Sequence, residues 1–154
     1  MRYASCMADS PAALRDLLIA TTRTLRRRWH QTLEPWQLSP HEHRALRVLG
    51  DAGRTRECGD ARGPLRLGEI AKALRIVPRS ATEVIDRLEA RGLTERLPDP
   101  ADRRAVCVQL TDAGHDLARQ LDAARDAEAG EFFALLDDRD RADLARILRK
   151  LVGP

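Results

Sequence analysis

Residues 67–110 read LGEIAKALRIVPRSATEVIDRLEARGLTERLPDPADRRAVCVQL, and this stretch decides the fold. Its first part places four apolar residues at i, i+3, i+4 and i+7, the spacing of one helix face: Leu67, Ile70, Ala71 and Leu74. Residues 75–77 follow, and then Pro78, a residue favoured at the first position of a helix. Two short helices joined by so tight a turn form a helix-turn-helix unit.

The helix that begins at Pro78 has an apolar stripe and a polar face. The stripe consists of Ala81, Val84, Ile85 and Leu88, and the side chains off it are Arg79, Ser80, Thr82, Glu83, Asp86 and Arg87. A helix N-terminus favours phosphate through its free backbone N–H groups and its dipole, and Arg, Ser and Thr can reach phosphates or base edges. Such a helix can enter a major groove. The alternative is an ordinary amphipathic helix with a solvated polar face.

Residues 93–110 predict a β-hairpin. Gly92 ends the preceding helix, residues 93–97 and 106–110 alternate as strands do, and residues 98–102 have turn chemistry. Arg103 and Arg104 lie at the tip, where Asp102 is close enough to hold one guanidinium. An arginine on a narrow loop can enter a minor groove, where the potential is most negative. The alternative is a surface ion pair of little energetic weight.

Helices are also expected before this stretch. A long helix starts at Ser10-Pro11 and runs to about residue 34, and Ser39 with Glu42 forms a capping box for the next helix. Between residues 50 and 64 the apolar pattern disappears, and four glycines with alternating charges predict a flexible loop.

Two further helices are expected after the hairpin. Thr111 caps one that runs to about Gly130, and Asp137 or Asp138 caps the last, whose apolar residues are Leu144, Ile147, Leu148 and Leu151. The apolar stripes of these outer helices are narrow and need a partner. Burial within a single chain is the alternative to a second subunit.

Composition narrows the function classes. The chain has 154 residues and a net charge of +3, which suits one domain and permits nucleic-acid binding. No apolar run approaches the roughly 18 residues that cross a bilayer, and the N-terminus lacks a secretion signal, so we expect a cytoplasmic protein without membrane contact. Motifs for nucleophilic, metal-dependent or nucleotide chemistry are missing, so we expect neither an enzyme nor a cofactor.

Cysteine and histidine placement argues against disulfide and metal sites. Cys6, Cys58 and Cys107 are too few and too dispersed for a disulfide framework, and no CxxC pair suggests zinc. His41 and His43 point away from each other on a helix and cannot bind one metal together. We therefore predict no metal site.

The chain resembles the MarR-type winged helix-turn-helix transcriptional regulators of bacteria. The segments that carry the resemblance are LGEIA (67–71), PRSAT (78–82), DRLEARGL (86–93), DPADRRA (99–105) and LT (110–111). The resemblance implies a mainly α (α+β) fold, a winged helix-turn-helix with a three-helix dimerisation region from both termini. Residues 1–154 then form a single domain, with dimerisation helices at 10–34 and 111–152, a DNA-binding lobe at 38–110 and the wing hairpin at 93–110.

The resemblance also implies roles for particular residues. The helix from Pro78 to Arg91 is the recognition helix, Arg104 enters the minor groove, and Asp102 orients Arg104. The predicted partners are a second copy of the chain and double-stranded DNA with an inverted-repeat operator. The predicted DNA contacts combine polar residues of the recognition helix with residues of the wing: Arg79, Ser80, Thr82, Glu83, Arg87, Asp102, Arg103 and Arg104.

The resemblance further implies a repressor that a small-molecule effector releases from DNA, and two alternatives accompany this prediction. Family members are released from DNA by a small aromatic effector or by oxidation of a cysteine. The segments that would line an effector pocket contain Trp29, His30, Trp36, His41 and Arg47, although tryptophan at helical spacing is commonly core. Cys6 is the candidate redox sensor, against the simpler interpretation of an unreactive terminal thiol. A winged-helix protein-interaction module without DNA binding is the second alternative, after a redox-sensing regulator that acts through Cys6.

Three departures from the family pattern stand out. Arg75 occupies a turn position where glycine or a small polar residue is usual, and a left-handed arginine there would cost roughly 1–2 kcal/mol. Arg66 stands where Ser or Thr is common, so the helix from Leu67 lacks a side-chain acceptor at its cap. The loop at 50–64 is also longer than usual.

Overall fold

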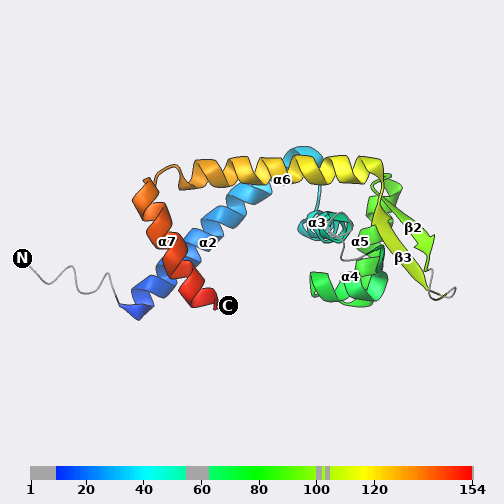
Figure 1. Ribbon diagram of the computed structural model, residues 1–154, viewed down its shortest axis with the longest axis horizontal. Helices are drawn as coiled ribbons and strands as arrows, with labels where there is room; N and C mark the ends of the chain where they lie inside the picture. The colour runs from blue at the N-terminus through cyan, green and yellow to red at the C-terminus, as the bar shows by residue number, and fades with distance from the viewer. Residues whose placement is uncertain (1–9, 55–62, 100–101, 103–104, 154) are drawn as a thin grey trace, which may run out of the picture. The chain divides into compact units, whose positions relative to one another are not determined.

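The computed structural model describes residues 10–54, 63–99, 102 and 105–153 (Figure 1). It divides into two compact units, one formed by residues 34–123 and one by residues 1–33 with 124–154. The predictions made for Cys6, Cys58, Arg103 and Arg104 fall outside the described residues. The mainly helical fold with a small antiparallel sheet is confirmed.

The unit of residues 34–123 contains the predicted helix-turn-helix and hairpin. Its elements are η1 (Glu34–Trp36), α3 (Pro40–Arg54), β1 (Leu65–Arg66), α4 (Leu67–Leu74), α5 (Pro78–Ala90), β2 (Thr94–Pro98), β3 (Val106–Leu110) and the first part of α6 (Asp112–Phe133). The strands form one antiparallel sheet in the order β1-β3-β2, with Leu65 opposite Val108 and Thr94 opposite Leu110. Figure 1 shows α4 and α5 next to this sheet.

The core of this unit is built from the predicted apolar stripes. The stripe of α5 is buried throughout, at Ala81, Val84, Ile85 and Leu88. The largest side chains that are almost completely buried come from α3, α4, α5, β3 and α6: Leu46, Ile70, Leu74, Ile85, Leu88, Val108 and Leu121. Because α5 buries one full stripe, its orientation against α3, α4 and the sheet is fixed by packing.

The predicted helix caps are present. The N–H of Ser39 donates to Glu42 Oε2 at 2.7 Å, and the N–H of Glu42 donates to Ser39 Oγ at 3.3 Å, which completes the capping box. Thr111 Oγ1 accepts the N–H of Gly114 at 3.1 Å where α6 begins. Asp137, rather than Asp138, caps the last helix by accepting the N–H of Asp140 at 2.8 Å.

Several predicted boundaries were wrong. Helix α3 continues to Arg54, so the start of the expected 50–64 loop is helical, because buried Ala52 extends the stripe that Leu49 belongs to. Helix α6 extends past Gly130 to Phe133. Strand β1 was not predicted, since two residues are too few to show alternation, and its pairing with β3 is a tertiary contact.

The two cap positions of α4 that depart from the family pattern differ in their effect. Arg75 adopts the left-handed conformation, with φ 56° and ψ 45°, so the turn keeps the usual geometry despite the arginine. At the other end, the N–H of Arg66 donates to Glu69 Oε2 at 2.8 Å. Glu69 therefore satisfies the backbone at the start of α4, and the Arg66 side chain is used elsewhere.

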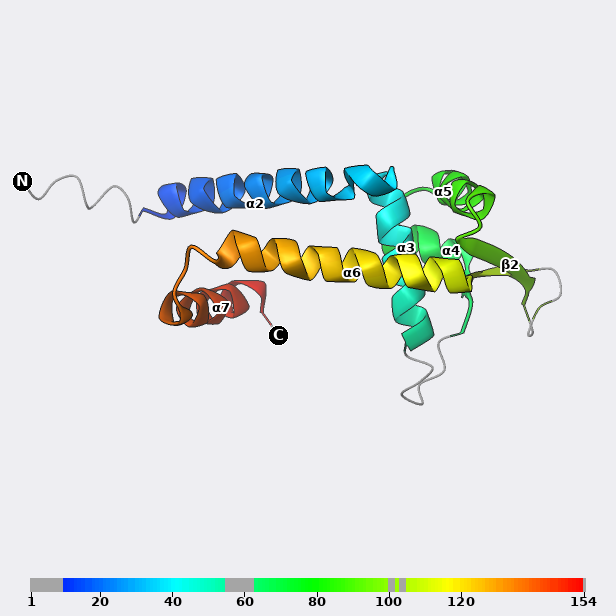
Figure 2. The ribbon, with the colours of Figure 1, turned by 90° about the horizontal axis from the view of Figure 1, so that it is seen from above.

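The second unit consists of helices. It contains α2 (Pro11–Leu33), the end of α6 and α7 (Asp138–Val152), which follows α6 after a short turn (Figure 2). Arg28 joins α2 to α6, because its Nε lies 2.6 Å from Glu128 Oε1 and its guanidinium lies 5.7 Å from the centroid of the Phe132 ring. Large apolar side chains are exposed on α2 and α7: Leu14, Leu17, Leu18, Ile19, Ile147, Leu148, Leu151 and Val152.

Across the described ranges, none of the helices has both the length and the apolar character that a bilayer span requires.

Candidate nucleic-acid interface

The first turn of α5 offers an exposed cation at a helix N-terminus. Val77 holds the N-cap position in an extended conformation, Pro78 follows, and the first turn contains no acidic residue. The side chain of Arg79 is 91% exposed, and its Nε lies 3.6 Å from Glu83 Oε1, one turn later on the same helix. An exposed i,i+4 pair of this kind is weak, so Arg79 is available to an anionic partner.

The two hydroxyl side chains of this turn are half-buried. Thr82 Oγ1 donates to the carbonyl of Pro78 at 3.2 Å, so its proton is used within the helix and its oxygen remains an acceptor. Ser80 lies beside Arg79 in the first turn. The structure thus brings Arg79, Ser80, Thr82 and Glu83 together at one end of α5.

Arg87 is engaged by the protein itself. Its Nε donates to Glu42 Oε1 at 3.1 Å, and Glu42 is buried in the first turn of α3. This contact ties α5 to α3. Sequence reasoning placed Arg87 among the DNA contacts by its position on the helix, and no signal in the sequence marks its partner.

An ion-pair cluster joins α5 to the hairpin. Arg96 of β2 donates to Asp86 at 2.5 Å and also to Glu89, and these hydrogen bonds raise the pKa of Arg96. Sequence reasoning missed Arg96. The detectable signal was a pair of acids at i,i+3 on α5 with a basic residue in the following strand.

The base of the wing is organised by Asp99, which sequence reasoning also missed. Its side chain is 7% exposed and accepts the Nε of Arg66 at 2.6 Å. Asp102, the predicted orienting residue, is exposed, and its N–H donates to Asp99 Oδ1 at 3.2 Å. Since Arg104 lies outside the described residues, its contact with Asp102 stays a prediction.

Cys107 belongs to the same region: it lies in the second strand of the predicted hairpin, and its side chain is buried. Burial raises the pKa of its thiol, and the adjacent Asp99 raises it further. A thiol held protonated in this way is a poor nucleophile.

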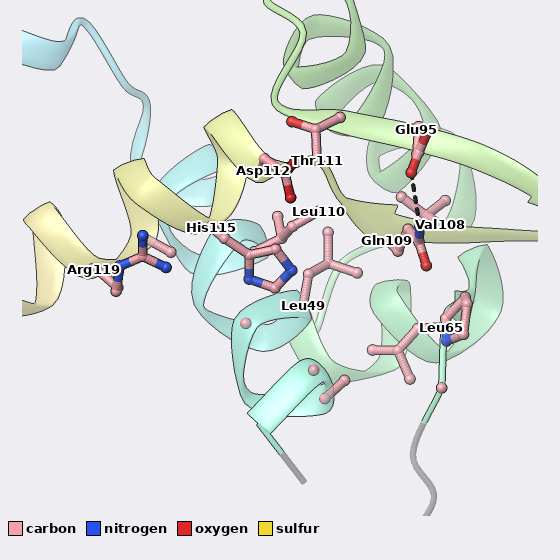
Figure 3. A pocket seen from close by; sticks show the side chains of 16 residues that line it. Leu49, Leu65, Glu95, Val108, Gln109, Leu110, Thr111, Asp112, His115 and Arg119 are labelled. Carbon is pink, nitrogen blue, oxygen red and sulfur yellow. Dashed lines mark hydrogen bonds between the residues drawn. The ribbon is translucent and has the colours of Figure 1, made fainter. Parts of the chain in front are cut away.

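A cavity of about 780 Å³ lies in the unit of residues 34–123. Figure 3 shows it between α3, the strands and the start of α6, with Leu49 and Leu110 near His115. The side-chain amide of Gln109 donates a hydrogen bond to Glu95 Oε1 at 2.7 Å. The volume of the cavity falls in the range of small-molecule sites. None of the five residues predicted to contact an effector is among those that line it.

Those five residues are divided between the two units. Trp29 and His30 lie on α2, whereas Trp36 lies in η1 and His41 and Arg47 lie on α3. Arg47 Nε is buried and has no hydrogen-bond partner among the described residues. The effector contacts remain a prediction.

Within the part of the chain that the structure describes, no group of three or more His, Cys, Asp or Glu side chains is placed to hold a metal ion.

Comparison with known proteins connects this geometry to a family. Residues 59–106 match the model of the MarR family. The HTH-type transcriptional repressor MdtR of Bacillus subtilis (strain 168) is 32% identical over 89 residues, which cover 58% of this chain and 57% of MdtR. The uncharacterized HTH-type transcriptional regulator YhbI of the same organism is 31% identical over 121 residues, covering 79% of this chain and 70% of YhbI. The chain therefore spans little more than half of MdtR and most of YhbI.

Solved structures give a similar result. The crystal structure of RV1404 from Mycobacterium tuberculosis matches with a TM-score of 0.77 and 25% identity, covering 94% of this chain and 93% of that one. The likeness extends across both compact units of the chain.

Proposed function

Because this chain belongs to the MarR family of transcriptional regulators, we propose that it binds double-stranded DNA in a sequence-specific manner and represses transcription. The observation that carries this proposal is the first turn of α5, where Arg79 is 91% exposed at a helix N-terminus without an acidic residue in its first turn. That family consists of transcription regulators and not enzymes.

The recognition geometry follows from the fixed position of α5. Its apolar stripe is buried, so the face that bears Arg79, Ser80 and Thr82 is the one left for a major groove. The hairpin of β2 and β3 is tied to α5 through Arg96, and its tip carries Arg103 and Arg104 in the sequence. We assign the major-groove contact to α5 and the minor-groove contact to Arg104.

We further propose that the active form is a homodimer. Leu17 on α2 is 61% exposed and Leu151 on α7 is 70% exposed, and apolar side chains gathered on outer helices indicate an interaction surface. A two-fold dimer presents two copies of α5 and therefore reads an inverted repeat with half-sites about one helical turn apart. This assigns dimerisation to residues 10–34 and 111–152 and DNA binding to residues 38–110.

We also propose that a small aromatic effector releases the protein from DNA and that the protein is cytoplasmic. Among the described residues the buried Arg47 Nε has no hydrogen-bond partner, and this supports a ligand contact on α3. An arginine in this state favours a ligand with a carboxylate or phenolate oxygen.

Duplex binding measured over a range of salt concentrations tests the proposed function. A DNA-binding regulator loses affinity linearly in a plot of log affinity against log salt, because bound phosphates release counterions. We expect Arg104→Ala to weaken binding by roughly 1–3 kcal/mol while the protein stays folded and dimeric. Arg119→Ala, which removes an exposed arginine paired with Asp116, is the control and should leave affinity unchanged. Affinity that does not depend on salt, or an unchanged Arg104→Ala variant, contradicts the proposal.

A further inference from the structure

Arg66 occupies two structural positions at once. It is the last residue of β1, where it lies opposite Cys107 of β3, and it is the N-cap residue of α4. Its backbone N–H is already satisfied by Glu69 at 2.8 Å. The side chain is therefore not needed to close the helix and extends to the base of the wing, where its Nε lies 2.6 Å from Asp99 Oδ2.

Asp99 is the acceptor at the centre of this region. Among the described residues, its buried carboxylate accepts hydrogen bonds from Arg66 Nε at 2.6 Å, the N–H of Asp102 at 3.2 Å and the Cys107 thiol at 3.5 Å. A buried carboxylate needs such partners, because desolvation disfavours its charge. Arg66 supplies the only positive charge among these three donors.

Backbone hydrogen bonds connect Asp99, Asp102 and Ala105 at the two ends of the wing tip. The N–H of Asp99 donates to the carbonyl of Ala105 at 3.1 Å, and the N–H of Ala105 donates to the carbonyl of Asp102 at 2.9 Å. Residues 99, 102 and 105 thus enclose the segment that contains Arg103 and Arg104 in the sequence. A contact that holds Asp99 in place therefore also holds the two points at which this segment joins the hairpin.

We propose that Arg66 and Asp99 form a positioning pair that holds the base of the wing against the helix-turn-helix unit and so sets the position from which the wing of this regulator contacts DNA. The inference rests on the proposed function, since it assumes that the wing contacts DNA. It also explains why arginine stands at a cap position where Ser or Thr is common. The side-chain cap is absent, and its place is taken by a link between the start of α4 and the wing.

A direct contact with phosphate is the competing role for Arg66, because its side chain is 49% exposed. The two roles differ in how they depend on the wing. A positioning residue acts through the wing arginines, so its effect disappears when the wing contact is removed. A phosphate contact acts independently and adds to the loss of the wing contact.

Arg66→Ser and Asp99→Asn separate these roles when each is made alone and together with Arg104→Ala. Serine restores a side-chain cap for α4, which should offset part of the stability that is lost when the buried Asp99 loses its charged partner, so the free energy of unfolding of each variant is measured beside its DNA affinity. We expect each single variant to weaken duplex binding by about five- to thirtyfold. In the Arg104→Ala background the further loss should be less than about twofold. Arg119→Ala, an arginine in the same unit without contact to the wing base, is the matched control.

Alkylation of Cys107 supplies a readout that does not involve DNA. In a chain with Cys6→Ser and Cys58→Ser, the buried Cys107 is the one remaining thiol and reports opening of the wing base. We expect its alkylation to be several-fold faster in Arg66→Ser than in the parent, after correction for any difference between the two in the free energy of global unfolding. An unchanged alkylation rate would overturn the proposed bracing.

The outcomes of the binding experiment are distinct. Additive losses from Arg66→Ser and Arg104→Ala, with a salt dependence reduced by about one phosphate for Arg66→Ser, would make Arg66 a phosphate contact and overturn the inference alone. If the unmodified chain binds no duplex, the proposed function fails and the inference fails with it.

Discussion

Arg87 of α5 donates its Nε to Glu42 Oε1 of α3 at 3.1 Å. The same carboxylate accepts the N–H of Ser39 at 2.7 Å through its other oxygen, so one buried side chain both closes the first turn of α3 and holds α5. The apolar packing of α5 against α3 is therefore supplemented by a carboxylate that lies in a different helix. This relationship leads to a prediction about pH.

The contribution of Glu42 to stability should disappear in acid. Burial raises the pKa of Glu42, but hydrogen bonds from Ser39 and Arg87 outweigh burial, and the pKa lies below its ordinary value of 4.5. A lowered pKa in the folded state adds stability above the unfolded pKa, and this stability is lost as the pH falls through the folded value. Glu42→Gln should thus lower the free energy of unfolding at neutral pH and have a smaller effect below the folded pKa of Glu42. Urea unfolding of the wild type and of Glu42→Gln at several pH values measures the difference in their free energies of unfolding. A difference that does not change with pH would contradict the prediction.

Replacing Arg79 by alanine should weaken DNA binding with little effect on stability, whereas replacing Arg87 by alanine should destabilise the fold. Arg79→Ala removes a side chain that is 91% exposed, so we expect a change in unfolding free energy within about 0.5 kcal/mol. Its affinity for DNA should fall by roughly 1–3 kcal/mol. Arg87→Ala leaves the buried Glu42 without its charged partner and should destabilise the fold by about 1–2 kcal/mol.

Comparing a specific with a random duplex defines the role of Arg79. An equal loss for both means that it positions the protein on phosphate, and a larger loss for the specific duplex means that it reads bases. Unaltered binding by Arg79→Ala to both duplexes would remove it from the interface.

Local patterns were sufficient to predict most of the fold. The stripe of α5, the capping box of Ser39 and Glu42, and the cap at Thr111 depend on neighbours within a few residues, and all three are present in the structure. Strand β1 could not be predicted in this way, because it exists only through its pairing with β3.

In the candidate site, too, local patterns predict some features and tertiary contacts determine the others. The exposed position of Arg79 follows from helical periodicity. The roles of Arg66 and Asp99 do not, since these residues are separated by 33 positions and meet only when β1 joins the sheet. Long-range ion pairs of this kind leave no periodic signal in one sequence.

Two glycines of α6 should respond differently to alanine. A Cβ at Gly114 would lie 2.0 Å from the carbonyl oxygen of Leu93, a backbone atom that cannot move without disturbing the turn before β2. We expect Gly114→Ala to destabilise the protein by about 1–3 kcal/mol or more. Gly130 has nothing within 4 Å of its Cβ position, so Gly130→Ala should stabilise the helix by roughly 0.5–1 kcal/mol. Thermal unfolding of the pair checks both signs, and equal effects would contradict the close approach at Gly114.

Arg75→Gly should stabilise the fold. The left-handed conformation of Arg75, with φ 56°, is unfavourable for any residue with a Cβ atom, and glycine adopts it without strain. We expect a gain of about 0.5–1 kcal/mol in unfolding free energy. Lys72→Gly, within the same helix, should instead lose roughly 1 kcal/mol, and a loss for both variants would argue against strain at Arg75.

Charged substitutions on the outer helices test the dimer. Leu17→Glu on α2 and Leu151→Glu on α7 place a carboxylate in the exposed apolar faces, and we expect each to shift the protein toward monomer in analytical ultracentrifugation. Leu135→Glu is the control, because Leu135 is 93% exposed and lies between α6 and α7. A wild-type chain that sediments as a monomer would exclude the dimer.

Selection of bound sequences from random duplex DNA tests the central claim most directly, since it examines binding, symmetry and spacing together. We predict enrichment of an inverted repeat whose half-sites lie about 10 base pairs apart, as two copies of α5 related by a two-fold axis require. A pool with no enriched sequence would contradict sequence-specific DNA binding by this chain, and enrichment of a single asymmetric site would contradict its recognition by a symmetric dimer.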